Sequence, residues 1–575
     1  MRLSGHYHGN NGRLGWLGSS RRLGTVSAVA VIAVGAALVP LSPASAGALA
    51  SAAAPPVILP QSPANISLTW AVPNYPVGRQ MRWLLNAVTE PPVPTAELKA
   101  HFDPRFLSLV PPATFNRDLE SLHLVPPLRI VTLSGGLTTS VLEADVAAGP
   151  GRLGLVMSVD AHGLIEGLQV SPSPTLPPAP KSWATLDAQV RSLAPDVSLE
   201  VATIPAPTLT GTASTTVPAG TGGAASASTV SAANGPTPTT APTTNTSTST
   251  SATAQVATNP TTATAGAAAT STTTNTTTPT PPSGESSFNA CNVVNSIDPT
   301  TARPLGSMFK LYVLATLANE AKSGRLSWDQ EVALASELRS LPSGVEQIEP
   351  AGTRFTVSQL AQLMISSSDN TAADQLGALV GRSALEDQVA STSADASLNL
   401  PFLRTRELFV LKYADYPHYA NAYLALPDAA RTAYLDDVID QVPLSDVDIN
   451  AASSGSPRAI SSIEWFASPA DICNLYSQLY SYASSSATAP VSTALSYNNG
   501  GIMLAPSSWP LVWFKGGSEQ GVLTLGYLAR RADGTVVVVV LELSNPGKAL
   551  ANNVTLSALA DVQAAFSLVP SSSGA

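Results

Sequence analysis

A tract of 84 residues, from Val201 to Gly284, contains no charged side chain and consists mostly of Thr, Ala, Ser and Pro. A segment of this composition cannot bury enough apolar surface to offset the entropy lost when its backbone is ordered. The tract is therefore predicted to be disordered. It constrains the fold strongly, because any globular structure must form from segments that find their partners across it.

The segments beside the tract have regular patterns. Residues 182–193 predict a helix with Ser182 as its cap and one apolar face, made of Trp183, Leu186, Val190 and Leu193. Leu199–Ile204, which extends into the first residues of the tract, and Cys291–Ile297 after it each predict a strand. Loop-closure entropy grows only slowly with loop length, so these strands can still pair. We therefore predict that the linker, residues 205–285, is inserted into the first hairpin of one domain, made of residues 182–204 and 286–570.

An earlier region, residues 62–180, predicts a separate small domain. Val77–Val88 has apolar residues at helical spacing, and Thr95 is expected to cap a second short helix. Four strand-like runs follow, with Asp160–Gly163 as a hairpin turn between the last two: Leu128–Leu133, Thr139–Val146, Leu153–Val159 and Leu164–Val170. Helices followed by a meander indicate an α+β fold. Nothing in the region commits to a ligand, and a docking or folding module is favoured over an enzyme.

Residues 1–46 have the pattern of a signal peptide. Arginines precede an apolar run over residues 26–39, and Ala44-Ser45-Ala46 is a typical cleavage site. The pair Arg21-Arg22 is compatible with twin-arginine export. The protein is therefore expected to be secreted or held in the cell envelope, with no stable membrane anchor after cleavage.

Charge and composition exclude several classes of function. The net charge is −10 and charged residues make up 12% of the chain, so nucleic acid is not an expected partner. Only His418 among the six histidines follows the tract, which argues against a Ser–His–Asp site or a metal centre there, and no cofactor is expected. In an exported chain an even cysteine count favours a disulfide, Cys291–Cys473. The alternative is two buried thiols.

The strongest candidate for chemistry is Ser307-Met308-Phe309-Lys310, where a mostly buried helix is predicted to begin. Residues three apart share a helix face, so the Lys310 amine can reach the Ser307 hydroxyl. A lysine can activate a serine in this way without a histidine. Taken alone, the motif is weak, and a helix cap followed by a surface lysine explains it better.

Two later motifs favour the catalytic interpretation. Ser368-Asp369-Asn370 follows an apolar helix over residues 360–365, and Lys515-Gly516-Gly517 precedes an apolar strand. Together the three motifs match the ordered set S-x-x-K, S-D-N, K-T-G of penicillin-binding proteins and class A β-lactamases.

With these motifs, residues 182–204 and 286–570 resemble a class A β-lactamase domain, an antiparallel sheet flanked by helices. The resemblance extends to the secreted actinobacterial serine hydrolases related to the β-lactamase-like protein of the clavulanic acid cluster. It rests on the segments Ser340–Gly344, Met364–Ala372, Pro401–Lys412 and Phe514–Glu519. That group also has a small N-terminal α+β domain of steroid-isomerase or cystatin type, to which residues 62–180 are similar.

The resemblance implies a role for each motif residue. These roles are acylated nucleophile for Ser307, base for Lys310, proton relay for Ser368, substrate-amide contact for Asn370, and carboxylate recognition for Lys515. Backbone N–H groups of Ser307 and Ser518 are expected to form the oxyanion hole, with Gly517 allowing the close backbone approach.

The sequence departs from the class A pattern in two places. Gly516 stands where the third motif has threonine. No E-x-x-L-N follows Asn370, so the glutamate that positions the deacylating water has no counterpart, and Glu386 and Glu407 lack its surroundings. Glu407 is instead expected in a structural ion pair. Tyr497-Asn498-Asn499 is interpreted as a polar turn.

The predicted function is that of an exported serine hydrolase that forms an acyl-enzyme with a β-lactam or a related amide or ester. The alternatives are an esterase, a D-Ala peptidase-like enzyme, and a cell-wall binding protein that stays acylated, with peptidoglycan as a further candidate partner.

Overall fold

The structure is a computed structural model that describes residues 31–32, 68–123, 128–135, 140–148, 151–172, 176–205 and 290–571. The predicted cleavage site, nearly all of the predicted signal peptide 1–46, and the predicted linker 205–285 beyond its first residue lie outside the described residues. In the described part of the chain, no helix combines the length and the apolar character that crossing a membrane requires.

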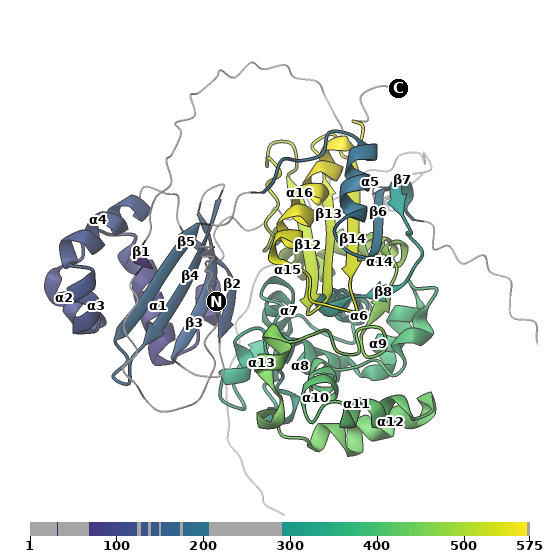
Figure 1. Ribbon diagram of the computed structural model, residues 1–575, viewed down its shortest axis with the longest axis horizontal. Coiled ribbons are helices and arrows are strands. Elements are labelled where there is room, and N and C mark those ends of the chain that lie inside the picture. Colours follow the sequence, from purple (N-terminus) through teal and green to yellow (C-terminus); the bar gives the residue numbers. More distant parts are fainter. Residues whose placement is uncertain are drawn as a thin grey trace, which may run out of the picture. The chain divides into compact units, whose positions relative to one another are not determined.

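The N-terminal region contains a helical layer and an antiparallel meander (Figure 1). The helical elements are η1 (Leu68–Ala71), α1 (Pro76–Ala87), α2 (Thr95–His101), α3 (Pro104–Leu109) and α4 (Pro112–His123). The meander consists of β2 (Arg129–Gly135), β3 (Val141–Ala148), β4 (Gly151–Val159) and β5 (Ile165–Pro172). A two-residue strand, β1 (Val31–Ile32), pairs in parallel with β5.

Apolar patterning explains why the helices cover one face of this sheet. Val77, Met81 and Leu84 of α1 are buried, and alternate residues of β3 are buried in the same core. The turn between β4 and β5 forms as predicted, because Asp160 accepts hydrogen bonds from the backbone N–H groups of His162 and Leu164. One detail of the prediction is wrong: Thr95 is the first helical residue of α2, and Pro94 before it provides no side-chain cap.

The C-terminal region is built on a five-stranded antiparallel sheet of order β12-β13-β14-β6-β7. Its strands are β6 (Asp196–Ile204), β7 (Asn292–Ile297), β12 (Leu511–Glu519), β13 (Val522–Arg530) and β14 (Val536–Ser544). β6 pairs with β14 on one side and with β7 on the other, with Leu199 opposite Ile297. A strand on the N-terminal side of the predicted linker 205–285 therefore lies inside a sheet whose other strands all follow that linker.

Helices cover both faces of this sheet (Figure 1). α5 (Trp183–Arg191) and α16 (Asn552–Leu568) pack on one face, and α14 (Pro469–Ala483) packs on the other beside α6 (Lys310–Lys322). Ser182 caps α5 by accepting a hydrogen bond from the N–H of Thr185. With both faces covered, β6 and β14 are buried along most of their length, which explains their nearly continuous apolar sequence.

A helical subdomain completes the C-terminal region. Its helices are α7 (Val357–Ser366), α8 (Asn370–Val380), α9 (Arg382–Ala390), α10 (Thr405–Tyr413), α11 (His418–Leu424), α12 (Asp428–Asp437), α13 (Ile449–Ser454) and α15 (Ala489–Ser496). Two short strand pairs accompany them: β8 (Arg303–Pro304) with β11 (Phe466–Ala467), and β9 (Glu331–Ala333) with β10 (Arg354–Thr356). Together with the N-terminal region, this arrangement confirms the predicted α+β class.

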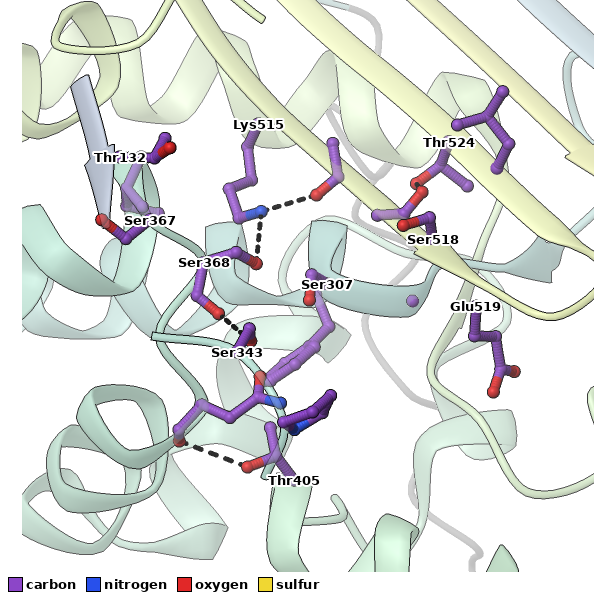
Figure 2. Close-up of a pocket in the computed structure, with 18 of the residues that line it drawn as sticks. Thr132, Ser307, Ser343, Ser367, Ser368, Thr405, Lys515, Ser518, Glu519 and Thr524 are labelled. Carbon is purple, nitrogen blue, oxygen red and sulfur yellow. Dashed lines mark hydrogen bonds between the residues drawn. The ribbon is translucent and has the colours of Figure 1, made fainter. Parts of the chain in front are cut away.

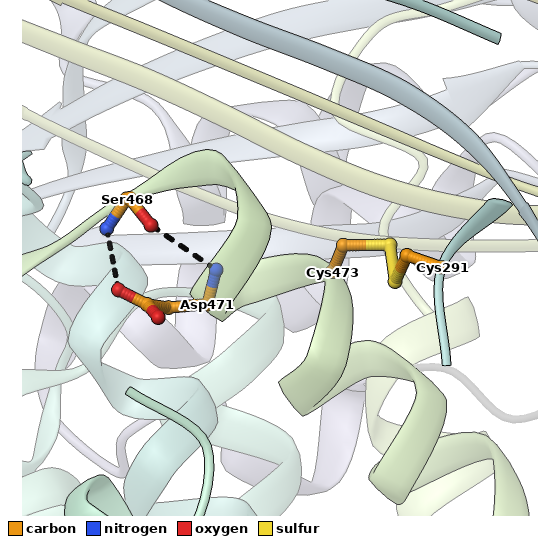
Figure 3. The surroundings of a disulfide bond; sticks show 4 residues. All are labelled: Cys291, Ser468, Asp471 and Cys473. Carbon is orange, nitrogen blue, oxygen red and sulfur yellow. Dashed lines mark hydrogen bonds between the residues drawn. A yellow bond between two sulfur atoms is a disulfide. The ribbon is translucent and has the colours of Figure 1, made fainter. Parts of the chain in front are cut away.

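A disulfide joins Cys291, just before β7, to Cys473 in α14 (Figure 3). The bond links residues 182 apart in sequence and ties the edge strand of the sheet to a helix that packs on it. α14 itself begins with a capping box, in which Ser468 and Asp471 each accept the other's backbone N–H.

Candidate active site

Ser307 lies in a short 3₁₀ helix, η2 (Gly306–Phe309), that runs directly into α6. Its side chain is half-buried, and Lys310 Nζ lies 3.3 Å from its Oγ. The i to i+3 spacing thus brings amine and hydroxyl into hydrogen-bonding range. Apolar neighbours on α6, including Leu311 and Leu314, are fully buried and fix the helix that carries Lys310.

Lys310 is completely buried, and its amine is surrounded by oxygen acceptors. Nζ donates to the carbonyl oxygen of Ser368 at 2.6 Å and to Asn370 Oδ1 at 2.6 Å, and lies 3.2 Å from Ser368 Oγ. Burial lowers the pKa of Lys310 from 10.5 to about 7, against the opposing effect of the Asp369 and Asp374 carboxylates. A substantial fraction of the amine is therefore neutral near pH 7 and able to accept a proton.

Ser368 stands between two lysines. Lys515 Nζ, from β12, lies 3.1 Å from its Oγ (Figure 2), and Lys310 Nζ lies 3.2 Å from the same oxygen. Ser368 has a φ of +56°, a left-handed conformation that non-glycine residues rarely adopt and that is often found at functional sites. Burial lowers the pKa of Lys515 well below its usual value, and the charge of Lys310 lowers it further.

The third motif places β12 close to the nucleophile. A Cβ added at Gly517 would lie 2.1 Å from the carbonyl oxygen of Leu305 and 2.6 Å from the backbone nitrogen of Ser307, so only glycine fits. A Cβ at Gly516 would lie 2.8 Å from the carbonyl oxygen of Thr524. This crowding explains why glycine replaces the threonine of the K-T-G motif. Ser518 follows with an exposed side chain that lines the cavity.

Asn370 is buried, and both of its polar side-chain atoms contact protein groups. Its Oδ1 accepts from Lys310, and its Nδ2 donates to the carbonyl oxygen of Leu341 at 2.7 Å. Beside it, Thr405 at the start of α10 donates to Asp374 and to the carbonyl oxygen of Asn370. The side chain of Asn370 therefore orients the Lys310 amine, and it also lines the cavity where the predicted substrate contact would form.

These side chains open into one cavity of about 500 Å³, the size of a small-molecule site. Figure 2 shows Ser307, Ser368, Lys515 and Ser518 facing this space, with Thr132 of β2 also on its lining. The predicted catalytic and substrate-binding residues are brought together here, except Lys310, which lies completely buried directly behind Ser307. Aromatic and aliphatic side chains provide an apolar part of the wall, among them Phe309, Leu408, Phe409, Trp465 and Phe514.

Neither glutamate considered as a deacylation base belongs to the cavity lining. Glu407 is fully buried and forms ion pairs with Arg382 at 2.7 Å and Arg404 at 2.8 Å, as expected for a structural residue. Glu386 accepts a hydrogen bond from the backbone N–H of Phe402. Among the described residues, the carboxylates that line the cavity are those of Glu464 and Glu519.

Several cavity residues carried no motif in the sequence. Ser343 donates from its hydroxyl to the carbonyl oxygen of Ser368 at 2.6 Å, and Thr405 contacts the opposite side of Asn370. Asn498 follows α15, lines the cavity and donates to the carbonyl oxygen of Ser366. The predicted polar turn at Tyr497-Asn498-Asn499 therefore contributes to the cavity wall. No sequence pattern marks these residues, and only the folded structure shows that they lie at the cavity.

Two clusters of described residues bring potential metal ligands together, and neither adjoins Ser307. Glu407, Asp436 and Asp440 lie close to one another, but Arg382 and Arg404 form ion pairs with them. Glu200 lies near Cys291 and Cys473, whose sulfur atoms are joined in the disulfide. The arrangement around Ser307 relies on lysine and hydroxyl groups.

Comparison with known proteins gives two family matches. Residues 290–496 match the β-lactamase enzyme family, and residues 72–165 match the family described as ORF 12 gene product N-terminal. No curated protein matches the chain.

Solved structures with similarity to this chain include a β-lactamase from Sphaerobacter thermophilus, with 19% identity, 48% of this chain and 88% of that chain covered, and a TM-score of 0.33. They also include a β-lactamase from Chitinophaga pinensis, with 16% identity, coverages of 49% and 90%, and a TM-score of 0.32. A third is PBP-A, with 14% identity, coverages of 47% and 84%, and a TM-score of 0.31. Values this low say nothing about mechanism or substrate. The family match shows that residues 290–496 are similar to the β-lactamase enzyme family, and the antiparallel sheet flanked by helices in the C-terminal region fits a β-lactamase-like fold.

Proposed function

We propose that this protein is an exported serine hydrolase that forms an acyl-enzyme at Ser307 with a β-lactam or a related amide or ester. The observation that carries the proposal is the continuous polar chain from Ser307 through Lys310 and Ser368 to Lys515, at the edge of a small-molecule cavity. The signal-peptide pattern and the Cys291–Cys473 disulfide support export.

In the acylation step, the neutral Lys310 amine takes the proton of Ser307 as Oγ attacks the substrate carbonyl. The negative charge that develops on the carbonyl oxygen is stabilised by the backbone N–H groups of Ser307 and Ser518, which the close approach of Gly517 brings near each other. The proton then passes from Lys310 through Ser368 to the leaving nitrogen or oxygen, and the acyl-enzyme remains. Lys515 holds Ser368 in place and is positioned to attract a substrate carboxylate.

Deacylation lacks an equally clear base. The groups around the Lys310 amine are Ser368, Asn370 and, next to Asn370, Thr405, and none of these is a carboxylate. Of the described carboxylates that line the cavity, Glu519 forms an ion pair with Lys412 and Glu464 accepts two backbone N–H groups. We therefore expect a β-lactam adduct to accumulate and to hydrolyse slowly, whereas an ester with a good leaving group turns over modestly with Lys310 as base.

The test is a time course of intact mass after mixing the protein with benzylpenicillin or with a p-nitrophenyl ester. The proposal expects a rapid mass increase of one penicilloyl group, lost slowly, in the wild-type protein. Ester hydrolysis without a penicillin adduct favours an esterase or a D-Ala peptidase-like enzyme. A stoichiometric adduct that never decays favours a cell-wall binding protein, for which peptidoglycan fragments are the next ligand to test. An unmodified mass with both compounds contradicts the proposal.

A further inference from the structure

A buried ion-pair cluster lies next to the loop that carries Ser307. It consists of Lys412 on α10, Glu464 before β11 and Glu519 at the end of β12, and we call it the Lys412 cluster. Lys412 is fully buried, with its Nζ 3.0 Å from Glu464 Oε1 and 2.6 Å from Glu519 Oε1. Buried charges are costly even when they are paired, and apolar residues of similar volume often stabilise a fold equally well. Stability alone is therefore a weak explanation for the cluster.

The second oxygen of Glu464 holds the backbone on the N-terminal side of the nucleophile. Glu464 Oε2 accepts the N–H of Gly306 and the N–H of Trp465, each at 3.2 Å. The N–H of Leu305 in turn donates to the carbonyl oxygen of Trp465 at 2.8 Å. The turn that presents Ser307 is thus fixed to the segment around Glu464 by two consecutive backbone N–H groups.

The other end of the cluster holds β12. Glu519 is the residue after Ser518, and Figure 2 shows it beyond Ser518, on the side away from Ser368. A Cβ added at Gly306 would lie 3.0 Å from the backbone nitrogen of Ser518, so the two segments are in near contact at the nucleophile. Lys412 therefore bridges the two chain segments that carry the expected oxyanion-hole donors.

We propose that Lys412 is a positioning residue for acylation, because it sets the separation of the Ser307 and Ser518 backbone N–H groups through Glu464 and Glu519. This inference rests on the proposed function. One oxyanion-hole donor accelerates the reaction by a factor of about 10² to 10³. A small displacement of the donor loses a large part of this acceleration. Lys412 touches neither the substrate nor Ser307, so its effect appears in the rate of the chemical step and leaves initial binding unchanged.

The test measures the limiting acylation rate constant and the initial binding constant separately, with a fluorophosphonate and with benzylpenicillin at 15 °C. Glu519→Ala cuts the link to β12 and leaves the Lys412–Glu464 pair balanced in charge, and Lys412→Met removes the bridge altogether. Each is expected to lower the limiting rate constant at least tenfold with the binding constant changed less than threefold. Glu519→Gln retains an oxygen acceptor for Lys412 and is expected to restore most of the limiting rate constant that Glu519→Ala loses.

Glu407→Gln is the matched control, because it disturbs an equally buried ion-pair group on the same helix, α10, away from the cavity lining. A purely structural role for Lys412 predicts that all four variants lose thermal stability and that the folded fraction acylates at the wild-type rate. If wild-type protein is labelled at Ser307 and the variants behave in this way, the positioning role of Lys412 is overturned and the proposed function stands. Wild-type protein that is not labelled at Ser307 overturns the proposed function and the inference with it.

Discussion

The pH dependence of acylation should report the pKa of Lys310. Burial lowers this pKa from 10.5 to about 7, and the catalytic form is the neutral amine. The acylation rate constant is expected to rise about tenfold per pH unit below pH 6 and to level off above pH 7 to 8. Lys310→Met should lower the plateau by about 10² to 10⁴, the usual contribution of a general base.

The size of the effect follows from the two pKa values. A lysine that kept a pKa of 10.5 would be neutral in about one molecule in 3,000 at pH 7, whereas a pKa of about 7 leaves half of the amines neutral. The difference corresponds to about 5 kcal/mol of destabilisation of the charged form in the folded protein. Since the folded-state pKa lies below that of the unfolded chain, the unfolded chain binds more protons between pH 7 and 10.5. The Lys310 contribution to the free energy of unfolding therefore increases with pH across that window.

The assay is rapid-quench mass spectrometry with a neutral p-nitrophenyl ester, so that the substrate does not titrate between pH 5 and 10. Lys322→Met, at the exposed end of the same helix α6, is the control and should retain the wild-type profile. A rate that is flat from pH 5 to 9, or that keeps rising tenfold per pH unit up to pH 10, would refute the assignment of Lys310 as the base.

Three further predictions concern the nucleophile, the disulfide and the uncharged tract. Ser307→Ala is expected to abolish covalent labelling by penicillin and fluorophosphonate with an unchanged circular dichroism spectrum; labelling at the normal rate would place the nucleophile elsewhere. Replacing Cys291 and Cys473 together by Ser should lower the free energy of unfolding, measured in urea titrations, by about 2–4 kcal/mol, because the disulfide closes a long loop. An unchanged midpoint of the urea transition would contradict this prediction. A protein that begins at Ser286 lacks β6, the strand between β14 and β7, and should fail to fold. A protein that begins at Lys181, with residues 210–283 replaced by a short Gly-rich turn, should fold and acylate. Equal stability of the two proteins would show that β6 is dispensable.

Local apolar patterns and motif spacing were enough to predict the individual helices and strands and the order of the motifs. Period-3.6 and period-2 apolar patterns located α1, α5 and the meander strands, since these elements each bury one face and expose the other. The pairing of β6 with β7 was also predicted from the sequence. α5 and β6 are separated from the rest of their domain by the linker, and they need partners beyond it to bury their apolar residues. The S-x-x-K spacing placed Lys310 beside Ser307, because three residues make nearly one helical turn.

Contacts between residues far apart in sequence could not be predicted in this way, because they depend on how the whole chain packs. Glu464 and Glu519 reach Lys412 across 52 and 107 residues, and no local pattern marks any of the three. The oxygen cage that surrounds the Lys310 amine, with the low pKa that burial produces, depends on the left-handed turn at Ser368 and on the burial of α6. Local patterns record which face of an element is buried, whereas the electrostatics of a site depend on which groups the packing of several elements brings within a few ångströms of one another.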